Sequence, residues 1–318
     1  MMRTLLLAFV ALTAIGAGGV YYAARTFDAA GPLATERDVV VPRGGLSEAA
    51  DVLAENGVIR DRFAFKVAAA ATYAEGPIRA AELSFPAGAS LRTVLDVLRS
   101  GRPVQHKLTI AEGLTAAQVA DILARNDVLS GDVPVPQEGR VLPDTYVFER
   151  PASRSGILSR GAAALHQAMS AAWAGRAPGL PLKSPEEALV LASIVEREAK
   201  LPAERPMIAR VFLNRLEKGM RLQADPTAAY GASGGLGRLD RPLEHADLER
   251  DDDYNTYVIA GLPVGPICNP GAASIRAVLH PADGNALYFV ADGTGGHLFT
   301  DHLAAQNANV VHLRGMRR

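Results

Sequence analysis

The chain has 318 residues, of which 48% are hydrophobic and 21% are charged, so it is long enough for about two domains with buried cores. Lysine and arginine together number 33 and aspartate and glutamate 34, a balance that argues against nucleic acid as the main partner. Cys268 is the only cysteine, which excludes an intramolecular disulfide.

The N-terminal segment has the composition of a membrane-spanning helix. Residues 4–24 contain no charged side chain and, as a helix, would span roughly 30 Å, the thickness of a hydrocarbon core. Arg3 precedes the segment, and Tyr21 and Tyr22 lie where interfacial aromatic residues are expected. We therefore expect residues 1–25 to form an uncleaved anchor with a cytoplasmic N-terminus. A cleaved signal peptide is the alternative, and both place the remaining chain outside the cytoplasm.

After a tether at 26–40, one pattern occurs three times, at 41–59, 85–101 and 110–129. Each copy consists of a short strand, a glycine turn, a serine or threonine cap and an amphipathic helix. Such units resemble the LysM-like modules that bind cell-wall glycans. Because each helix needs its apolar face covered, we expect the units to pack together in a small α+β region over 41–135. A plain α+β spacer is the alternative.

A polar, proline-rich stretch at 131–140 indicates a linker, and we expect a larger α+β catalytic domain over 136–318. Apolar periodicity predicts helices at 157–175 and 203–218. Residues 287–307 are typical of a strand, a glycine turn, a second strand and a helix. The predicted fold is therefore α+β in both domains, preceded by a transmembrane helix.

The sequence ALVLASIVEREAK at 188–200 predicts a buried helix that ends in acidic residues. Ser184 is a suitable N-cap, Pro185 suits the first helical position and Pro202 stops the helix. Burial would raise the pKa of the Glu196 carboxyl, and a carboxylic acid that keeps its proton is what cleavage of a sugar–sugar bond needs. Glu198 faces a neighbouring side of the helix and is the lesser candidate.

A structural role for these glutamates is the alternative. Glu196 or Glu198 would then pair with Arg197, Lys200 or Arg205 and simply complete a buried helix.

Further polar residues suggest a sugar-binding groove. If 221–225 is extended and Pro226 ends the strand, Gln223 and Asp225 point to the same side and suit hydroxyl and acetamido groups. Asp225 in a backbone turn is the alternative. Ser193 shares the helix face of Glu196 and is a further candidate for substrate binding.

The stiff loop at 252–271 adds the last candidates. Tyr254 and Tyr257 are expected to stack on sugar faces, and Asn255 and Asn269 to bind N-acetyl groups; an ordinary rigid loop is the alternative. The histidines and the lone cysteine lack the spacing of a metal site, so we expect neither a metal nor a cofactor.

Taken together, these motifs resemble the endolytic murein transglycosylase family, also called YceG-like or MltG. The matching pieces are VLPDTYVF at 141–148, ASIVERE at 192–198, FLNRL at 212–216, GMRLQADPT at 219–227, YNTY at 254–257, GLPVGPICNPG at 261–271 and YFV with GGHLF at 288–299.

The resemblance implies a membrane-anchored lytic transglycosylase that cleaves peptidoglycan and terminates nascent glycan strands. It implies that the glutamate of the ASIVE motif, Glu196, is the catalytic residue. Glu196 would protonate the oxygen that leaves N-acetylmuramic acid, then accept the proton of that sugar's C6 hydroxyl as it closes a 1,6-anhydro ring. The implied partners are peptidoglycan glycan strands, the inner membrane and peptidoglycan synthases, with the catalytic domain in the periplasm.

Two alternatives remain at this point. One is a hydrolase in which Glu196 works with Asp225 or Glu198 as a second carboxylate. The other is a non-catalytic scaffold that binds peptidoglycan.

Overall fold

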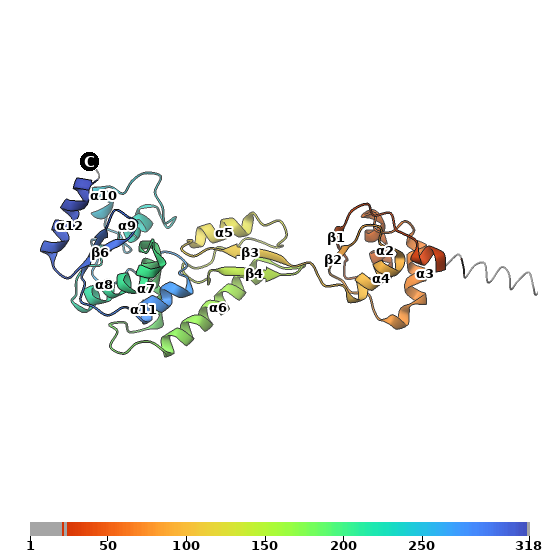
Figure 1. Cartoon of the computed structure of the whole chain (residues 1–318), viewed down its shortest axis with the longest axis horizontal. Coiled ribbons are helices and arrows are strands. Elements are labelled where there is room, and N and C mark those ends of the chain that lie inside the picture. Colours follow the sequence, from red (N-terminus) through yellow and green to blue (C-terminus); the bar gives the residue numbers. More distant parts are fainter. Residues whose placement is uncertain (1–20, 22–23, 317–318) are drawn as a thin grey trace, which may run out of the picture. The chain divides into compact units, whose positions relative to one another are not determined.

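The computed structural model describes residues 21 and 24–316, which divide into two compact units (Figure 1). The first unit contains the described residues up to His106 together with Val147–Pro151, and the second contains Lys107–Tyr146 and the chain from Ala152 onward. The predicted membrane segment lies outside the described residues except at Tyr21 and Ala24. Among the described helices, none is long and apolar enough to cross a membrane.

The first unit is built on a two-stranded antiparallel sheet. Its elements are β1 (Arg37–Val40), α2 (Leu46–Glu55), α3 (Arg62–Ala71), η1 (Tyr73–Glu75), β2 (Glu82–Phe85) and α4 (Leu91–Ser100). β1 pairs with β2 so that Arg37 lies opposite Phe85 and Val40 opposite Glu82. Leu53, Phe65 and Phe85 are fully buried in the core between the sheet and the helices. The LysM-like identity of this unit stays a prediction.

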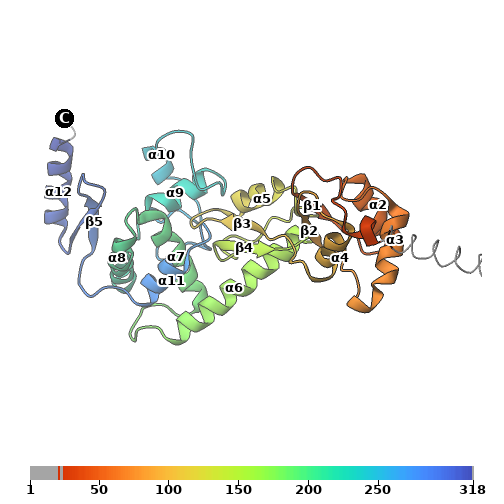
Figure 2. The ribbon, with the colours of Figure 1, turned by 45° about the vertical axis from the view of Figure 1, so that its right-hand side comes forward.

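The second unit contains the remaining elements, apart from the first residue of β3 and the last two of β4, which belong to the first unit. They are β3 (His106–Ile110), α5 (Ala116–Ala124), β4 (Asp144–Phe148), α6 (Arg154–Ala174), α7 (Pro185–Glu198), η2 (Pro202–Glu204), α8 (Arg205–Glu217), α9 (Asp225–Ala232), α10 (His245–Leu248), α11 (Ala272–Leu279), β5 (Tyr288–Ala291), β6 (His297–Thr300) and α12 (Leu303–Met316). β5 and β6 form an antiparallel hairpin, and Figure 2 shows α12 lying against it.

The division of the chain differs from the predicted boundary at 135–136. The third strand–turn–helix copy, at 110–129, belongs to the second unit rather than packing with the other two. Its strand β3 pairs with β4, from the VLPDTYVF segment, and Thr109 and Thr145 share a hydroxyl–hydroxyl hydrogen bond of 2.9 Å. Pairing between strands that are far apart in the sequence therefore places this copy in the second unit. The local sequence pattern does not predict that pairing.

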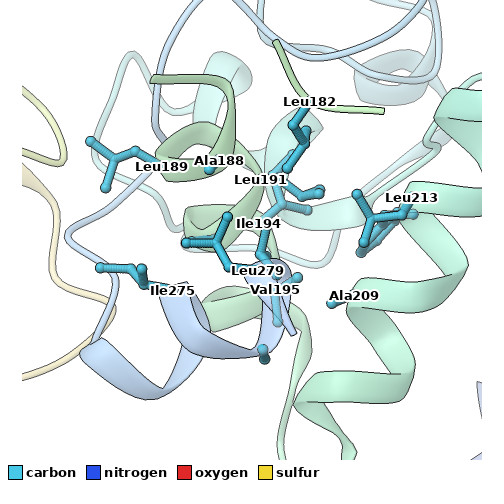
Figure 3. Packing of buried hydrophobic residues seen from close by; sticks show 14 of the residues in the cluster. Leu182, Ala188, Leu189, Leu191, Ile194, Val195, Ala209, Leu213, Ile275 and Leu279 are labelled. Carbon is cyan, nitrogen blue, oxygen red and sulfur yellow. The ribbon is translucent and has the colours of Figure 1, made fainter. Parts of the chain in front are cut away.

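Helix α7 forms the centre of the second unit (Figure 3). Ser184 caps it as predicted, since its hydroxyl accepts a hydrogen bond from the Glu187 amide, and the helix starts at Pro185. Every residue from Ala188 to Val195 is buried. Helices α8 and α11 cover two of its sides, which is why the helix is apolar all round.

The predicted strand at 221–225 is wrong. Residues 221–224 form no regular element, and Asp225 is the first residue of α9, so Pro226 opens a helix instead of ending a strand. A proline in the first helical turn loses no hydrogen bond, because amides there have no partner within the helix.

Candidate active site

The last turn of α7 contains two glutamates that point in different directions. Glu196 and Glu198 are two positions apart, which turns their side chains by about 200° around the helix axis. They therefore face nearly opposite sides rather than neighbouring ones.

The carboxylate of Glu196 accepts three hydrogen bonds from the helices that surround α7. Oε1 accepts from Nη2 of Arg205 at 3.0 Å, and Oε2 accepts from the Gly271 amide at 3.0 Å and from Oγ of Ser274 at 2.7 Å. Its side chain is only 6% exposed. A cation, an amide at the start of α11 and a hydroxyl therefore all donate to this one carboxylate.

Arg205 joins Glu196 to a second carboxylate. Its Nη2 also lies 3.1 Å from Oε2 of Glu112, in the loop that follows β3. A Cβ atom at position 271 would lie 1.9 Å from Oε1 of Glu112, so any larger residue there would displace the Glu112 side chain. Glu112, Glu196, Arg205 and Gly271 thus connect the β3 loop, α7, α8 and α11 at one point.

Glu198 lies in the opposite kind of environment. Among the described residues, no group donates a hydrogen bond to its carboxyl. Burial, reinforced by the negative charge of Asp225, raises the pKa of Glu198 to about 8, although Arg215 and Lys200 oppose the shift. The residue as a whole is half-buried, and its carboxyl is desolvated. Glu198 therefore keeps its proton at neutral pH.

Asp225 and Tyr257 lie in the surroundings of Glu198, and Gln223 is two positions before Asp225 in the chain. The hydroxyl of Tyr257 donates to Oδ1 of Asp225 at 2.5 Å. Burial raises the pKa of Tyr257, and this hydrogen bond and the negative charges of Asp225 and Glu198 add to the rise. Gln223 and Asp225 are exposed. Gln223 has φ +51°, the only non-glycine residue with a positive φ in the described part of the chain.

Hydrogen bonds to the YNTY loop hold the left-handed backbone at Gln223. Its amide donates to the carbonyl oxygen of Thr256 at 3.1 Å, and the next amide, of Ala224, donates to the Thr256 hydroxyl at 3.0 Å. The Thr256 hydroxyl also meets that of Thr227 at 2.8 Å. A left-handed conformation costs energy for a residue with a side chain. These hydrogen bonds offset that cost and hold the backbone at Gln223 in place.

Arg215 supports the same region from the interior of the protein. Its guanidinium is buried, donates to the carbonyl oxygens of Leu222 and Leu287 at 2.7 Å each, and lies 5.3 Å from the centre of the Tyr288 ring. Its positive charge is also one of those that act on Glu198. Arg215 is not among the site residues predicted from the sequence, although an arginine in the apolar FLNRL stretch of α8 was a usable signal.

Three of the predicted substrate-binding residues have structural roles instead. Ser193, Asn255 and Asn269 are at most 1% exposed, so no substrate can reach them. Ser193 accepts from the Ile267 amide and donates to the Val190 carbonyl, which ties the 261–271 loop to α7. The amide of Asn255 donates to three carbonyl groups between residues 247 and 250.

Asn269 joins two distant segments in the same manner. Its oxygen accepts from the Val141 amide at 2.9 Å and its nitrogen donates to the Leu114 carbonyl at 2.9 Å. Polar side chains in a rigid loop bond the backbone that surrounds them when the loop is buried.

Tyr254 packs against the protein as well. Its ring centre lies 4.7 Å from that of Tyr230, whose hydroxyl donates to Glu138. That face of the Tyr254 ring is therefore not available to a sugar. Of the predicted residues, the structure brings Asp225 and Tyr257 close to Glu198. In the described part of the chain, no three histidine, cysteine or acidic side chains are grouped as metal ligands would be.

A half-buried carboxylic acid beside a second carboxylate and an exposed amide is the arrangement of general-acid chemistry on a polar substrate. The comparisons with known proteins agree with that class. Residues 39–312 match the model of the YceG-like family, and the chain belongs to this family.

Curated relatives carry an informative name. An endolytic murein transglycosylase of Bacillus subtilis is 32% identical over 308 residues, covering 86% of this chain and 83% of the relative. A Streptococcus pneumoniae protein of the same name is 32% identical over 165 residues, covering 51% of this chain and 29% of that protein. The 2.6 Å crystal structure of a YceG-like protein from Listeria monocytogenes matches with a TM-score of 0.52 and 28% identity, covering 86% of this chain and 98% of that one.

Proposed function

We propose that this chain is a lytic transglycosylase that cleaves the glycan strands of peptidoglycan, with Glu198 as its acid and base. The observation that carries the proposal is the environment of Glu198, a carboxyl that retains its proton at neutral pH and that receives no hydrogen bond from the described residues. The relatives named endolytic murein transglycosylase supply the substrate class.

The chemistry needs one carboxyl group that acts twice. Glu198 gives its proton to the glycosidic oxygen as the bond from that oxygen to C1 of N-acetylmuramic acid breaks. The resulting carboxylate then takes the proton of the C6 hydroxyl of the same sugar, whose oxygen bonds to C1. Glu198 is protonated again at the end, so neither water nor a second nucleophile is consumed.

The neighbouring residues have distinct roles in this proposal. Asp225 disfavours a second negative charge nearby and so keeps Glu198 protonated until substrate arrives. The exposed Gln223 offers an amide donor and acceptor for a sugar acetamido group. Tyr257 orients Asp225 through its hydrogen bond.

Glu196, the residue that the sequence predicts as the acid, has its two oxygens occupied by three donors. To donate a proton it would have to break the contact with Arg205 or with the start of α11. We assign it instead to holding the last turn of α7 in place, so that Glu198 is presented at the correct position.

Analysis of the products tests the proposal and its alternative. Muropeptides released from isolated cell wall are separated and weighed by mass spectrometry. Ends of the 1,6-anhydro type support a lytic transglycosylase, whereas reducing ends require water and would assign Asp225 as the second carboxylate of a hydrolase. Binding of glycan without any cleavage would support the alternative, a non-catalytic scaffold that binds peptidoglycan.

The cellular setting is part of the same proposal. An uncharged segment at 4–24 supports a membrane anchor, with the second unit outside the cytoplasm and acting on nascent strands beside peptidoglycan synthases. Cleavage within such strands would limit their length. Separating membranes from soluble extract, followed by protease treatment of intact spheroplasts, tests the location and orientation.

A further inference from the structure

The first unit exposes an apolar face along α3. Phe63 is 75% exposed and Val67 50%, and Tyr73, in the η1 turn that follows, is 79% exposed. Phe63 and Val67 are one helical turn apart, and Ala70 and Ala71 continue the same face into solvent. Large apolar side chains gathered on one face indicate a surface that meets an apolar partner.

This face belongs to a well-formed helix. The opposite side of α3 buries Phe65 and Ala69 in the core of the unit. Asp61 caps the N-terminus, since its Oδ1 accepts from the amides of Phe63 and Ala64 at 2.6 and 3.0 Å. The helix is thus fixed by its own cap and core contacts, which leaves its apolar outer side without a function in folding.

The chain enters the unit beside the start of α3. Thr26, Gly31 and Pro32 line one pocket together with Val58 and Arg60, which directly precede the helix cap. The short helix at residues 24–28 lies beside α3 in the views of both Figure 1 and Figure 2. The predicted membrane segment ends at residue 24, and two residues reach at most about 7 Å. An anchor at 4–24 therefore brings the N-terminal end of α3 to the surface of the bilayer.

Basic residues flank the apolar face. Arg60 is exposed and Lys66 half-exposed, and neither forms a salt bridge within the described residues. A helix with aromatic and aliphatic residues on one side and basic residues at its flank is typical of segments that lie in the interface of a bilayer with anionic lipids.

We propose that the outer face of α3, comprising Phe63, Val67, Ala70, Ala71 and Tyr73, rests in the headgroup region of the membrane that holds the anchor. The inference rests on the membrane anchoring proposed above. Lipid suits this face better than glycan, because alanine and valine accompany its aromatic rings and the side chains at its flank, Arg60 and Lys66, carry the positive charge that anionic headgroups attract.

A lipid-quenching experiment on the full-length chain tests this inference. Val67→Cys is labelled with the environment-sensitive fluorophore nitrobenzoxadiazole, which reaches the new thiol selectively because Cys268 is fully buried. The protein is reconstituted into vesicles of phosphatidylethanolamine and phosphatidylglycerol, with or without doxyl-labelled lipid. The matched control carries the label at Val135→Cys, an apolar position that is 69% exposed in the second unit.

We expect a blue-shifted emission that doxyl lipid quenches at position 67, and neither effect at position 135. Adding Phe63→Ser and Tyr73→Ser should reduce the quenching at position 67 while cleavage of isolated glycan stays unchanged. A blue shift without quenching would assign the face to a protein partner, such as a second copy, and overturn the inference. An unshifted, unquenched label on protein that floats with the vesicles would also overturn it.

Flotation and cleavage separate the two proposals. Protein that fails to float with the vesicles refutes the anchoring, and this inference with it. The muropeptide assay on the same sample reports the activity of the second unit independently of either result.

Discussion

Glu196 and Glu198 lie two residues apart on one helix, yet the structure treats them in opposite ways. Glu196 receives a guanidinium, a backbone amide and a hydroxyl, whereas no described group donates to Glu198, whose pKa rises to about 8. The difference teaches that burial alone does not make an acid. Donors that accompany burial stabilise the charge, and desolvation without donors retains the proton.

The strongest test of this comparison is the removal of the proton donor. Glu198→Gln keeps the shape of the side chain but has no acidic proton at neutral pH, so we expect turnover to fall by about 10²–10⁴-fold. Release of anhydro-muropeptides from isolated cell wall measures the loss, and circular dichroism checks the fold. Turnover close to that of the wild type would remove Glu198 from the mechanism.

Glu196→Gln is the matched variant, with the same chemical change two positions earlier. The variant removes one of the two carboxylates that pair with Arg205, whose side chain is largely buried. We therefore expect the free energy of unfolding to fall by about 2–4 kcal/mol. For a unit of this size the melting temperature should fall by several degrees, on the order of 5–10 °C. Below that temperature turnover should change less than about tenfold.

The reverse result would reassign the acid. If Glu196→Gln abolished turnover with its melting temperature unchanged while Glu198→Gln remained active, the hydrogen bonds at Glu196 would have to open in the substrate complex.

The pH dependence of turnover sharpens the role of Asp225. Because Glu198 has to be protonated to act, kcat/KM should decline as the pH rises through about 8. Asp225→Asn removes the negative charge that helps to raise this pKa, so the decline should begin at lower pH, while the asparagine oxygen still accepts from Tyr257. An alkaline limb that stays in place in the variant would show that Asp225 does not act on Glu198.

A further prediction concerns the pH dependence of stability. The pKa of Glu198 is about 8 when folded and near its ordinary value of 4.5 when unfolded, so the folded state binds the proton more tightly. The stabilisation is complete below about pH 4.5 and is lost as the pH rises through 8. The melting temperature of the wild type should therefore fall relative to that of Glu198→Gln between pH 5 and 9. A constant difference across this range would contradict the shifted pKa.

Much of the fold could be read from local signals. The serine cap and proline start located α7, the apolar stripe located α8, and the strand and turn pattern at the C-terminal end located β5, β6 and α12. Each of these depends on residues within about four positions of one another, which is the range over which capping and periodicity act.

The sequence by itself determined that a buried helix ends in carboxylates, and its motifs pointed to the right family. Only the tertiary structure decided which carboxylate receives hydrogen bonds, because the donors to Glu196 are Arg205, Gly271 and Ser274, from segments far along the chain. It also decided that Asn255 and Asn269 bind backbone rather than substrate, and that the strand at 110 pairs with the one at 145. Hydrogen-bond partners and solvation depend on contacts between segments far apart in the chain, and local patterns do not encode them.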